Sequence, residues 1–370
     1  MTETDAHEPF DFAKHEQEAV TQYLQVVNFF GDLADVGRRI ADEALKRRDI
    51  RIHSIEARAK DPVSFGRKAR KPAKDDPNTP MYPSPLKQIT DLAAIRIITF
   101  FPRTIDDIDK MLREEFEVVE EIDKGKSLLD EERFGYQSLH YLVTLTSART
   151  SLPEYERFAS ATVEVQVRTI LQHAWAEIEH DIQYKSSATI PRDIKRRFLA
   201  LAGLLEIADR EFQAIQDADK ELKSRAETLI SAGELQAVEI TPSALKAYLD
   251  KRIGSDGRMS DFSYDWTARL LLRLGFRSLE QVDQCIAPYN DDHLSRLIDG
   301  YRQGQLTRFD YMLLAGMGDY FISRHPWSGQ AWFQSRFPTL LKRLVEHKVK
   351  IGNFDPSPAI QPSDSSEEEV

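Results

Sequence analysis

Alternating apolar and polar residues, followed at once by a helical pattern, make Thr162–Lys185 the most distinctive stretch of the chain. Valines alternate there with Glu164, Gln166 and Arg168, which predicts a strand with one apolar and one polar face. The residues that follow place an apolar stripe opposite a polar one, as in an amphipathic helix. A polar strand face leading into such a helix indicates a functional site, although the solvated face of an edge strand would give the same pattern.

The polar side of the predicted helix carries His173, Glu177 and His180, which are residue types that bind metals. Their spacing differs from the HExxH pattern of zinc sites. We therefore expect surface or core-edge roles for this stripe rather than a metal site.

Strand and helix patterns alternate through the first part of the chain. A long helix is predicted from Phe12 to about Arg48. Further predicted elements are strands at Leu92–Phe101, Phe116–Ile122, Leu139–Leu145 and Thr162–Arg168, a helix at Thr104–Glu115, and another that starts at Pro191. This order predicts an α/β (α+β) domain with a mixed central sheet flanked by helices.

The strand signals stop after about Ala226, and helix signals continue. Thr241 and Pro242 form an N-cap with proline at the first helical position, and Gly275 ends a helix that starts at Trp266. Further helices are expected at Asn290–Gln303, Thr307–Ser323 and Gln330–Lys348. We predict three parts: residues 1–225, a small all-α domain at 237–350 with regulation as a candidate role, and a disordered acidic tail at 351–370.

Composition narrows the class of protein. A net charge of -11 and a pI near 5.4 argue against general coating of nucleic acid. Basic residues nevertheless cluster in Lys46–Lys74. This segment could form a solvated or RNA-attracting surface, or it could form a phosphate clamp. Composition alone does not distinguish the two. The single cysteine, Cys285, fits a reducing compartment, and the sequence shows neither a membrane-spanning run nor a signal peptide. A soluble cytoplasmic protein is expected, with no membrane partner.

Polar residues also stand inside short apolar or glycine-bearing runs in four separate segments. These are Arg58–Lys68, Ile89–Ile98, Phe134–Leu142 and Val163–Lys185. Cations of this kind hold a polyphosphate, carboxylates hold Mg²⁺, and an exposed ring stacks on a base. The combination indicates phosphoryl transfer.

The same segments resemble, in order, the motifs of the synthetase domain of the RelA/SpoT family, whose members make the alarmone (p)ppGpp. The resemblance is to a small alarmone synthetase, spans about Lys46 to Lys185, and is followed by a helical extension. The matching residues are Arg58, Lys60, Ser64 and Lys68; Asp91, Ile95 and Arg96; Gly135, Tyr136, Ser138, Leu139 and His140; Glu164, Gln166, Arg168 and Thr169; and Trp175, Ala176, Glu179, His180, Tyr184 and Lys185. Five motifs in register make a chance match improbable.

The resemblance implies a nucleotidyltransferase-like fold and a GTP diphosphokinase reaction. ATP would give its β,γ-pyrophosphate to the ribose 3′-hydroxyl of GDP or GTP, with release of AMP. On the ATP side, Arg58 and Arg96 would stack on the adenine. Lys60, Ser64 and Lys68 would hold the phosphates.

The resemblance also implies the metal and acceptor sites. Asp91 and Glu164 would bind Mg²⁺, and Glu164 would take the proton of the 3′-hydroxyl. Tyr136 would stack on the guanine. His140 and Gln166 would lie near the phosphates and ribose of the acceptor.

The sequence departs from the family pattern in two places that bear on function. Ala94 stands where the family usually has glycine, and Phe134 follows a longer, acidic segment, Asp123–Arg133. The acceptor, and whether Lys124 or Lys126 contacts its phosphates, therefore stays open. Because the N-terminal helix leaves no room for the hydrolase domain of larger members, we expect synthesis without hydrolysis.

Two alternatives remain open. Some toxic relatives transfer pyrophosphate to the 3′ end of tRNA, and here the basic stretch Lys46–Arg51 would bind RNA while the helical domain restrains the enzyme in cis. The other is a nucleotide-binding regulator without chemistry, against which the paired acids Asp91 and Glu164 argue. Related small synthetases often assemble as oligomers, and the sequence leaves open whether this chain does.

Overall fold

The computed structural model describes residues 10–123, 138–185, 192–256 and 260–356. Two compact units make up the chain, residues 1–216 and residues 217–370. Most of the predicted acidic tail lies outside the described residues, as do Tyr136, Lys124 and Lys126.

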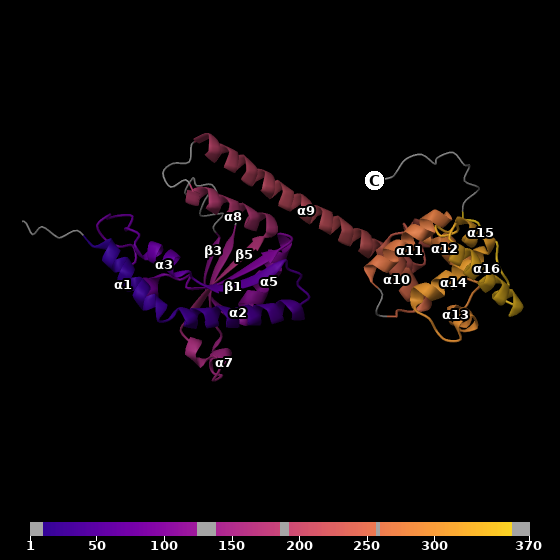
Figure 1. Cartoon of the computed structure of the whole chain (residues 1–370), viewed down its shortest axis with the longest axis horizontal. Helices are drawn as coiled ribbons and strands as arrows, with labels where there is room; N and C mark the ends of the chain where they lie inside the picture. The colour runs from indigo at the N-terminus through magenta and orange to yellow at the C-terminus, as the bar shows by residue number, and fades with distance from the viewer. Residues whose placement is uncertain (1–9, 124–137, 186–191, 257–259, 357–370) are drawn as a thin grey trace, which may run out of the picture. The chain divides into compact units, whose positions relative to one another are not determined.

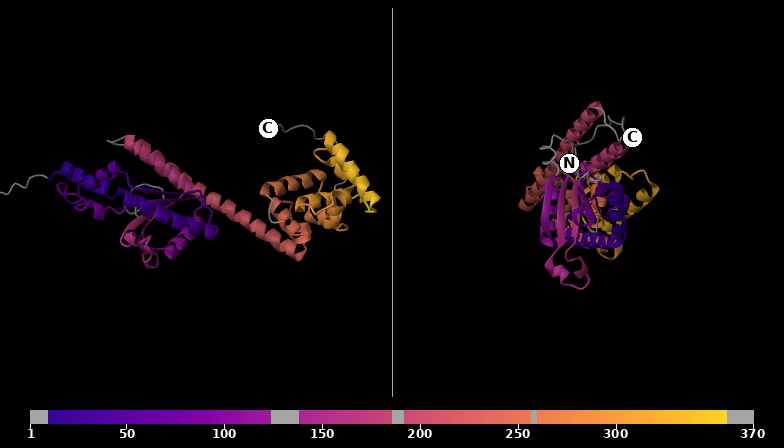
Figure 2. Two further views of the ribbon diagram at one scale, coloured as in Figure 1. Left: turned by 60° about the horizontal axis from the view of Figure 1, so that its bottom comes forward. Right: turned by 90° about the vertical axis from the view of Figure 1, so that its left-hand side faces the viewer.

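A five-stranded mixed sheet forms the centre of the first unit, which confirms the predicted fold class. The strands lie in the order β1-β2-β5-β4-β3, with β2 and β5 parallel and the other neighbours antiparallel. Their bounds are β1 Ser54–Ala59, β2 Ala93–Thr99, β3 Phe116–Asp123, β4 Leu139–Leu145 and β5 Thr162–Thr169. Since β5 lies in the middle, the edge-strand interpretation of its polar face is wrong. Figure 2 shows these strands side by side in its right-hand view.

The helices of the first unit are α1 Phe12–Leu24, α2 Val27–Arg47, α3 Pro62–Ala69, α4 Pro85–Gln88, α5 Arg103–Glu115, α7 Ser147–Thr150 and α8 Ile170–Lys185, with a 3₁₀ turn at Glu156–Phe158. Helix α9, Arg192–Ala232, has its first part in this unit and its last part in the second. The single helix predicted from Phe12 to Arg48 is wrong, because the chain breaks at Gln25 and Val26. The two pieces bury different faces: Tyr23 of α1 stacks on Phe65 of α3, whereas α2 packs on the sheet.

The apolar side of the sheet faces α2 and α5 and forms the core of the first unit. Val163, Val165 and Val167 of β5 are buried there, as their alternation predicts. Burial of this face leaves the other side of the sheet to the polar residues. Helix α8 contacts β2 and β5, and it lies across the sheet from α2 (Figure 1).

The second unit is all-α in its described part. After the end of α9 and a 3₁₀ turn at Leu235–Ala237 come α10 Pro242–Ile253, α11 Asp261–Leu274, α12 Leu279–Ile286, α13 Asp291–Asp299, α14 Gln305–Met317, α15 Asp319–Arg324 and α16 Ala331–Glu346. The Thr241 side chain caps α10, and Gly275 ends α11 in the left-handed conformation, as predicted. The helix predicted at Thr307–Ser323 is divided at Gly318, whose φ is 57°.

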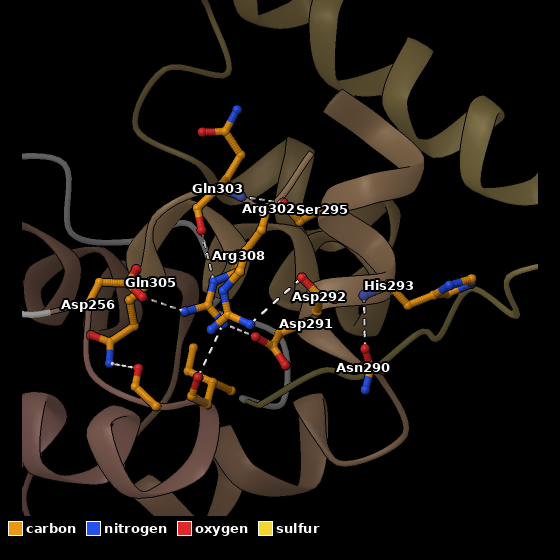
Figure 3. Close-up of polar contacts among 12 residues, drawn as sticks. Asp256, Asn290, Asp291, Asp292, His293, Ser295, Arg302, Gln303, Gln305 and Arg308 are labelled. Atoms are coloured by element: carbon orange, nitrogen blue, oxygen red, sulfur yellow. Dashed lines mark hydrogen bonds and ion pairs between the residues drawn. The ribbon is translucent and has the colours of Figure 1, made fainter. Parts of the chain in front are cut away.

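A buried arginine joins several segments of the second unit (Figure 3). Arg308 is fully buried, and its guanidinium donates to the Ile253 and Gln303 carbonyls. It also pairs with Asp256, at 3.0 Å, and with Asp291. A buried charge needs such partners, since an unpaired one is strongly destabilising.

Among the described residues of the chain, none of the helices is long and apolar enough to cross a membrane.

Candidate active site

The polar face of the sheet gathers half of the predicted site residues. Residues paired across neighbouring strands point to the same side of a sheet. Arg96 of β2 pairs with Gln166 of β5, which pairs in turn with His140 of β4. Through a second row, Arg58 pairs with Ala94 and Ala94 with Glu164. These side chains therefore share the face opposite α2.

Two lysines and an aspartate form an ion cluster beside this face. Asp91, just before β2, lies 2.5 Å from Lys60 Nζ and 3.0 Å from Lys68 Nζ, and all three side chains are mostly buried. Burial alone raises the pKa of the Asp91 carboxyl, but the hydrogen bond and charge of Lys60, together with Lys68, outweigh it. The pKa is lowered as a result, so Asp91 is ionised at neutral pH.

Helix α3 places Ser64 and Lys68 one turn apart. Asp61 caps this helix by accepting from the Ser64 amide at 2.8 Å, and Pro62 starts its first turn. The Ser64 hydroxyl accepts a hydrogen bond from Arg67 at 3.0 Å. The cap fixes where α3 begins, and one turn after Ser64 the helix places Lys68 in the ion cluster with Asp91.

A cavity of about 300 Å³ lies between the two predicted adenine-binding arginines. Its lining includes Arg58, Arg96 and Gln166, together with Glu56. The Arg96 guanidinium also donates to Glu177 of α8 at 3.1 Å. Glu177 lies outside the matched motif positions, so the motifs do not predict its place in this site.

A second polar group surrounds Glu164 of β5. Its Oε1 lies 2.6 Å from His140 Nδ1, and its Oε2 accepts from the Gln166 amide at 3.3 Å. The other ring nitrogen of His140 lies 3.0 Å from the Ser138 hydroxyl. His140 and Ser138 are buried, so the carboxylate meets a shielded hydrogen-bond network.

The two predicted metal ligands lie toward the same end of neighbouring parallel strands, but with different partners. Asp91 contacts lysines, and Glu164 contacts His140 and Gln166. Within the described residues there is no cluster of three or more His, Cys, Asp or Glu side chains that would form a protein-only metal cage. Mg²⁺ does not need one, because it commonly binds one or two carboxylates together with substrate phosphates and water.

Arg168 is a further polar residue on this face, for which the sequence analysis predicts no specific role. Its guanidinium is largely buried, and its Nε has no hydrogen-bond partner among the residues that the structure describes. Burial, followed by repulsion from Arg96, lowers the pKa of Arg168. A buried donor of this kind is suited to an anionic ligand.

Residues 57–189 match the model of the region found in RelA / SpoT proteins, which confirms, for this part of the chain, the resemblance seen in the motifs.

The chain is also similar to two proteins that are named GTP pyrophosphokinases. The chain is 29% identical over 175 residues to GTP pyrophosphokinase YjbM of Bacillus subtilis (strain 168), covering 47% of this chain and 76% of that protein. It is 28% identical over 131 residues to GTP pyrophosphokinase YwaC of the same organism, covering 35% and 59%. Among solved structures, small alarmone synthetase 1 from Bacillus subtilis is 24% identical, with a TM-score of 0.43 over 54% of this chain and 98% of that one.

Proposed function

We propose that the chain is a GTP diphosphokinase that transfers pyrophosphate from ATP to the 3′-hydroxyl of GDP or GTP, making (p)ppGpp and AMP. The observation that carries the proposal is the clustering of motif residues on one sheet face inside the RelA/SpoT domain. Both relatives are named GTP pyrophosphokinases, which supports the same reaction here. We place the protein in the cytoplasm, where these nucleotides are available, and we propose that it synthesises (p)ppGpp without hydrolysing it.

ATP binds by exchange in this proposal. Lys60 and Lys68 already face a carboxylate, and the phosphates of ATP replace Asp91 as their partners. Ser64 lies on the same helix as Lys68 and adds a hydroxyl. Arg58 and Arg96 hold the adenine at the cavity that they line, because planar guanidinium groups stack well on rings.

Mg²⁺ fits this site through Asp91 and Glu164. Asp91 is ionised at neutral pH because its pKa is lowered, and the hard oxygens of both carboxylates suit this cation. When bound with ATP, Mg²⁺ supplies neutralisation of the phosphate charge.

Glu164 acts as the base of the reaction. The O–H bond of the acceptor ribose breaks as its proton passes to Glu164, and the 3′-oxygen forms a bond to the β-phosphorus of ATP. The bond from that phosphorus to the α-phosphate oxygen breaks, and AMP leaves with the electron pair. Gln166 of β5 and His140 of β4 lie next to Glu164, at the place proposed for the acceptor ribose. The sequence assigned Tyr136 to the guanine, and that role stays a prediction.

A product assay tests this function. Purified protein would receive Mg²⁺ and ATP labelled in its γ-phosphate, with GDP, GTP, ATP or deacylated tRNA offered in separate reactions. Label on GDP or GTP, with one AMP released per transfer, is the expected result. Label on tRNA alone would replace the proposal with the toxin alternative, and no transfer despite ATP binding would leave a nucleotide-binding regulator.

The structure gives the tRNA alternative no specific support. Arg47 and Arg48, in the basic stretch that would bind RNA, form ion pairs with Glu115, and Arg48 also pairs with Glu114. Arg149 pairs with the same Glu115. These charges are already matched within the protein, which lowers their value for a phosphate backbone.

We also propose a homo-oligomer. Large apolar side chains along α9 are at least half exposed to solvent: Leu201, Leu204, Ile207, Phe212, Ile215 and Leu222. Contiguous exposed apolar surface usually marks an interaction site. Light scattering should give a mass above one chain for the native protein, and Leu204→Glu with Ile215→Glu should reduce it.

The helical domain at 237–350 is proposed to regulate the synthetase domain at 1–225. Deleting residues 237–370 should then change kcat for alarmone synthesis. Circular dichroism would establish that the shortened chain is folded. Unchanged turnover by a folded truncated protein would contradict regulation.

A further inference from the structure

The His140 side chain is buried and contacts Glu164 directly. The imidazole is 2% exposed. One ring nitrogen lies 2.6 Å from the Glu164 carboxylate, and the other lies 3.0 Å from the Ser138 hydroxyl. Both nitrogens thus contact side chains of this protein, whereas the motif match had placed His140 beside the acceptor.

The proton on this ring follows from the contacts. Glu164 must be ionised to act as the proposed base, and an ionised carboxylate only accepts hydrogen bonds. Nδ1 then carries the hydrogen that lies between the ring and Glu164. The Ser138 hydroxyl can donate or accept, and it therefore satisfies Nε2 in either protonation state. A ring held at both nitrogens and packed away from water has one orientation, and it fixes the carboxylate that it contacts.

We propose that His140 is a positioning residue for Glu164. Its Nδ1–H holds Oε1, and we assign the hydroxyl proton to Oε2, which accepts from Gln166. The hydrogen bond from His140 Nδ1 to Glu164 Oε1 is strong when its acceptor is a charged carboxylate shielded from water. The proposal rests on the function given above and adds that β4 supplies the group that orients the base on β5.

Two variants of His140 separate positioning from acceptor binding. The asparagine side-chain amide donates from nearly the same place as Nδ1, whereas that of glutamine reaches the place of Nε2. His140→Asn should keep most of kcat. His140→Gln should lower kcat by about 100-fold, the cost typical of a misplaced reacting group, with KM for ATP and GTP little changed.

The opposite pattern would overturn the proposal. A raised KM for GTP at unchanged kcat in both variants would make His140 an acceptor ligand. Equal losses in both variants, with lowered melting temperatures, would make it merely structural.

A measurement without substrate keeps this test separate from that of the overall function. In unliganded protein labelled with ¹⁵N-histidine, the signal lost in His140→Gln should show a protonated Nδ1. An unprotonated Nδ1 would refute the positioning role whatever the reaction. A protonated Nδ1 in a protein that transfers no pyrophosphate would contradict the proposed function while supporting the contact.

Discussion

In the proposed function, Arg96 exchanges its acidic partner Glu177 for the adenine of ATP. The Arg96 guanidinium donates to Glu177 of α8 at 3.1 Å. ATP binding in the proposed function breaks this ion pair, so its free energy opposes binding. We therefore expect Glu177→Gln to tighten the binding of ATP.

The expected size of the effect follows from the exposure of the pair. The Arg96 side chain is 21% exposed and the Glu177 side chain 56%, so solvent screens much of the attraction. Pairs of this kind contribute ~0.2–1 kcal/mol. Since about 1.4 kcal/mol corresponds to a tenfold change, the Kd for ATP should fall by ~1.4- to 5-fold.

Calorimetric titration with a non-hydrolysable ATP analogue measures this change. Glu206→Gln is a matched control, because Glu206 is 54% exposed and pairs with Arg210 within α9. The same substitution in an Arg96→Gln background separates the ion pair from the general effect of removing a negative charge. If Glu177→Gln tightens binding equally in both backgrounds, or weakens it in the native one, the reasoning is refuted.

Three further predictions concern single residues. Glu164→Gln should keep ATP binding but lower transfer by orders of magnitude, because the amide cannot take the proton; near-normal turnover would reject Glu164 as the base. Asp91→Asn should destabilise the protein near neutral pH, and urea titrations should show the difference from the native protein closing in acid. The folded-state pKa of Asp91 is lowered, so its stabilisation is present above its unfolded pKa of about 3.9 and is lost as pH falls through the folded value; a difference independent of pH would contradict this. Arg308→Met should cost about 3–5 kcal/mol in the unfolding of the second unit by leaving Asp256 and Asp291 unpaired, and a cost within error in denaturant melts would show that the pairing contributes little.

The sheet was largely predictable because alternation survives in its strands. The bounds of β4 match the prediction, and those of β2, β3 and β5 differ from it by one or two residues. Strand β1 was missed, although Ile55, Ala57 and Ala59 alternate there with polar residues. Its arginine belongs to a basic segment that we interpreted by charge alone, so the period of two went unnoticed.

Motif order predicts candidate site residues, but it does not show which of them are in contact. The contact between His140 and Glu164 depends on the register of β4 against β5, and residues far apart in sequence acquire their register only in the sheet. The ion pair of Arg96 with Glu177 depends on where α8 crosses the polar face. Arg308 shows the same limit in the second unit: its helix looks like ordinary apolar core, and nothing local indicates a buried guanidinium.

Several of the groups assigned to substrate and metal have protein partners of opposite charge. Asp91 is matched by Lys60 and Lys68, and Arg96 by Glu177. Such pairing stabilises an otherwise repulsive site, and under the proposed function ligands would bind by exchange. ATP phosphates would take the two lysines, and Asp91, without the cations that hold it, would be able to hold Mg²⁺. Binding of the nucleotide and of the metal should therefore be coupled, because the same three side chains change partners in both events.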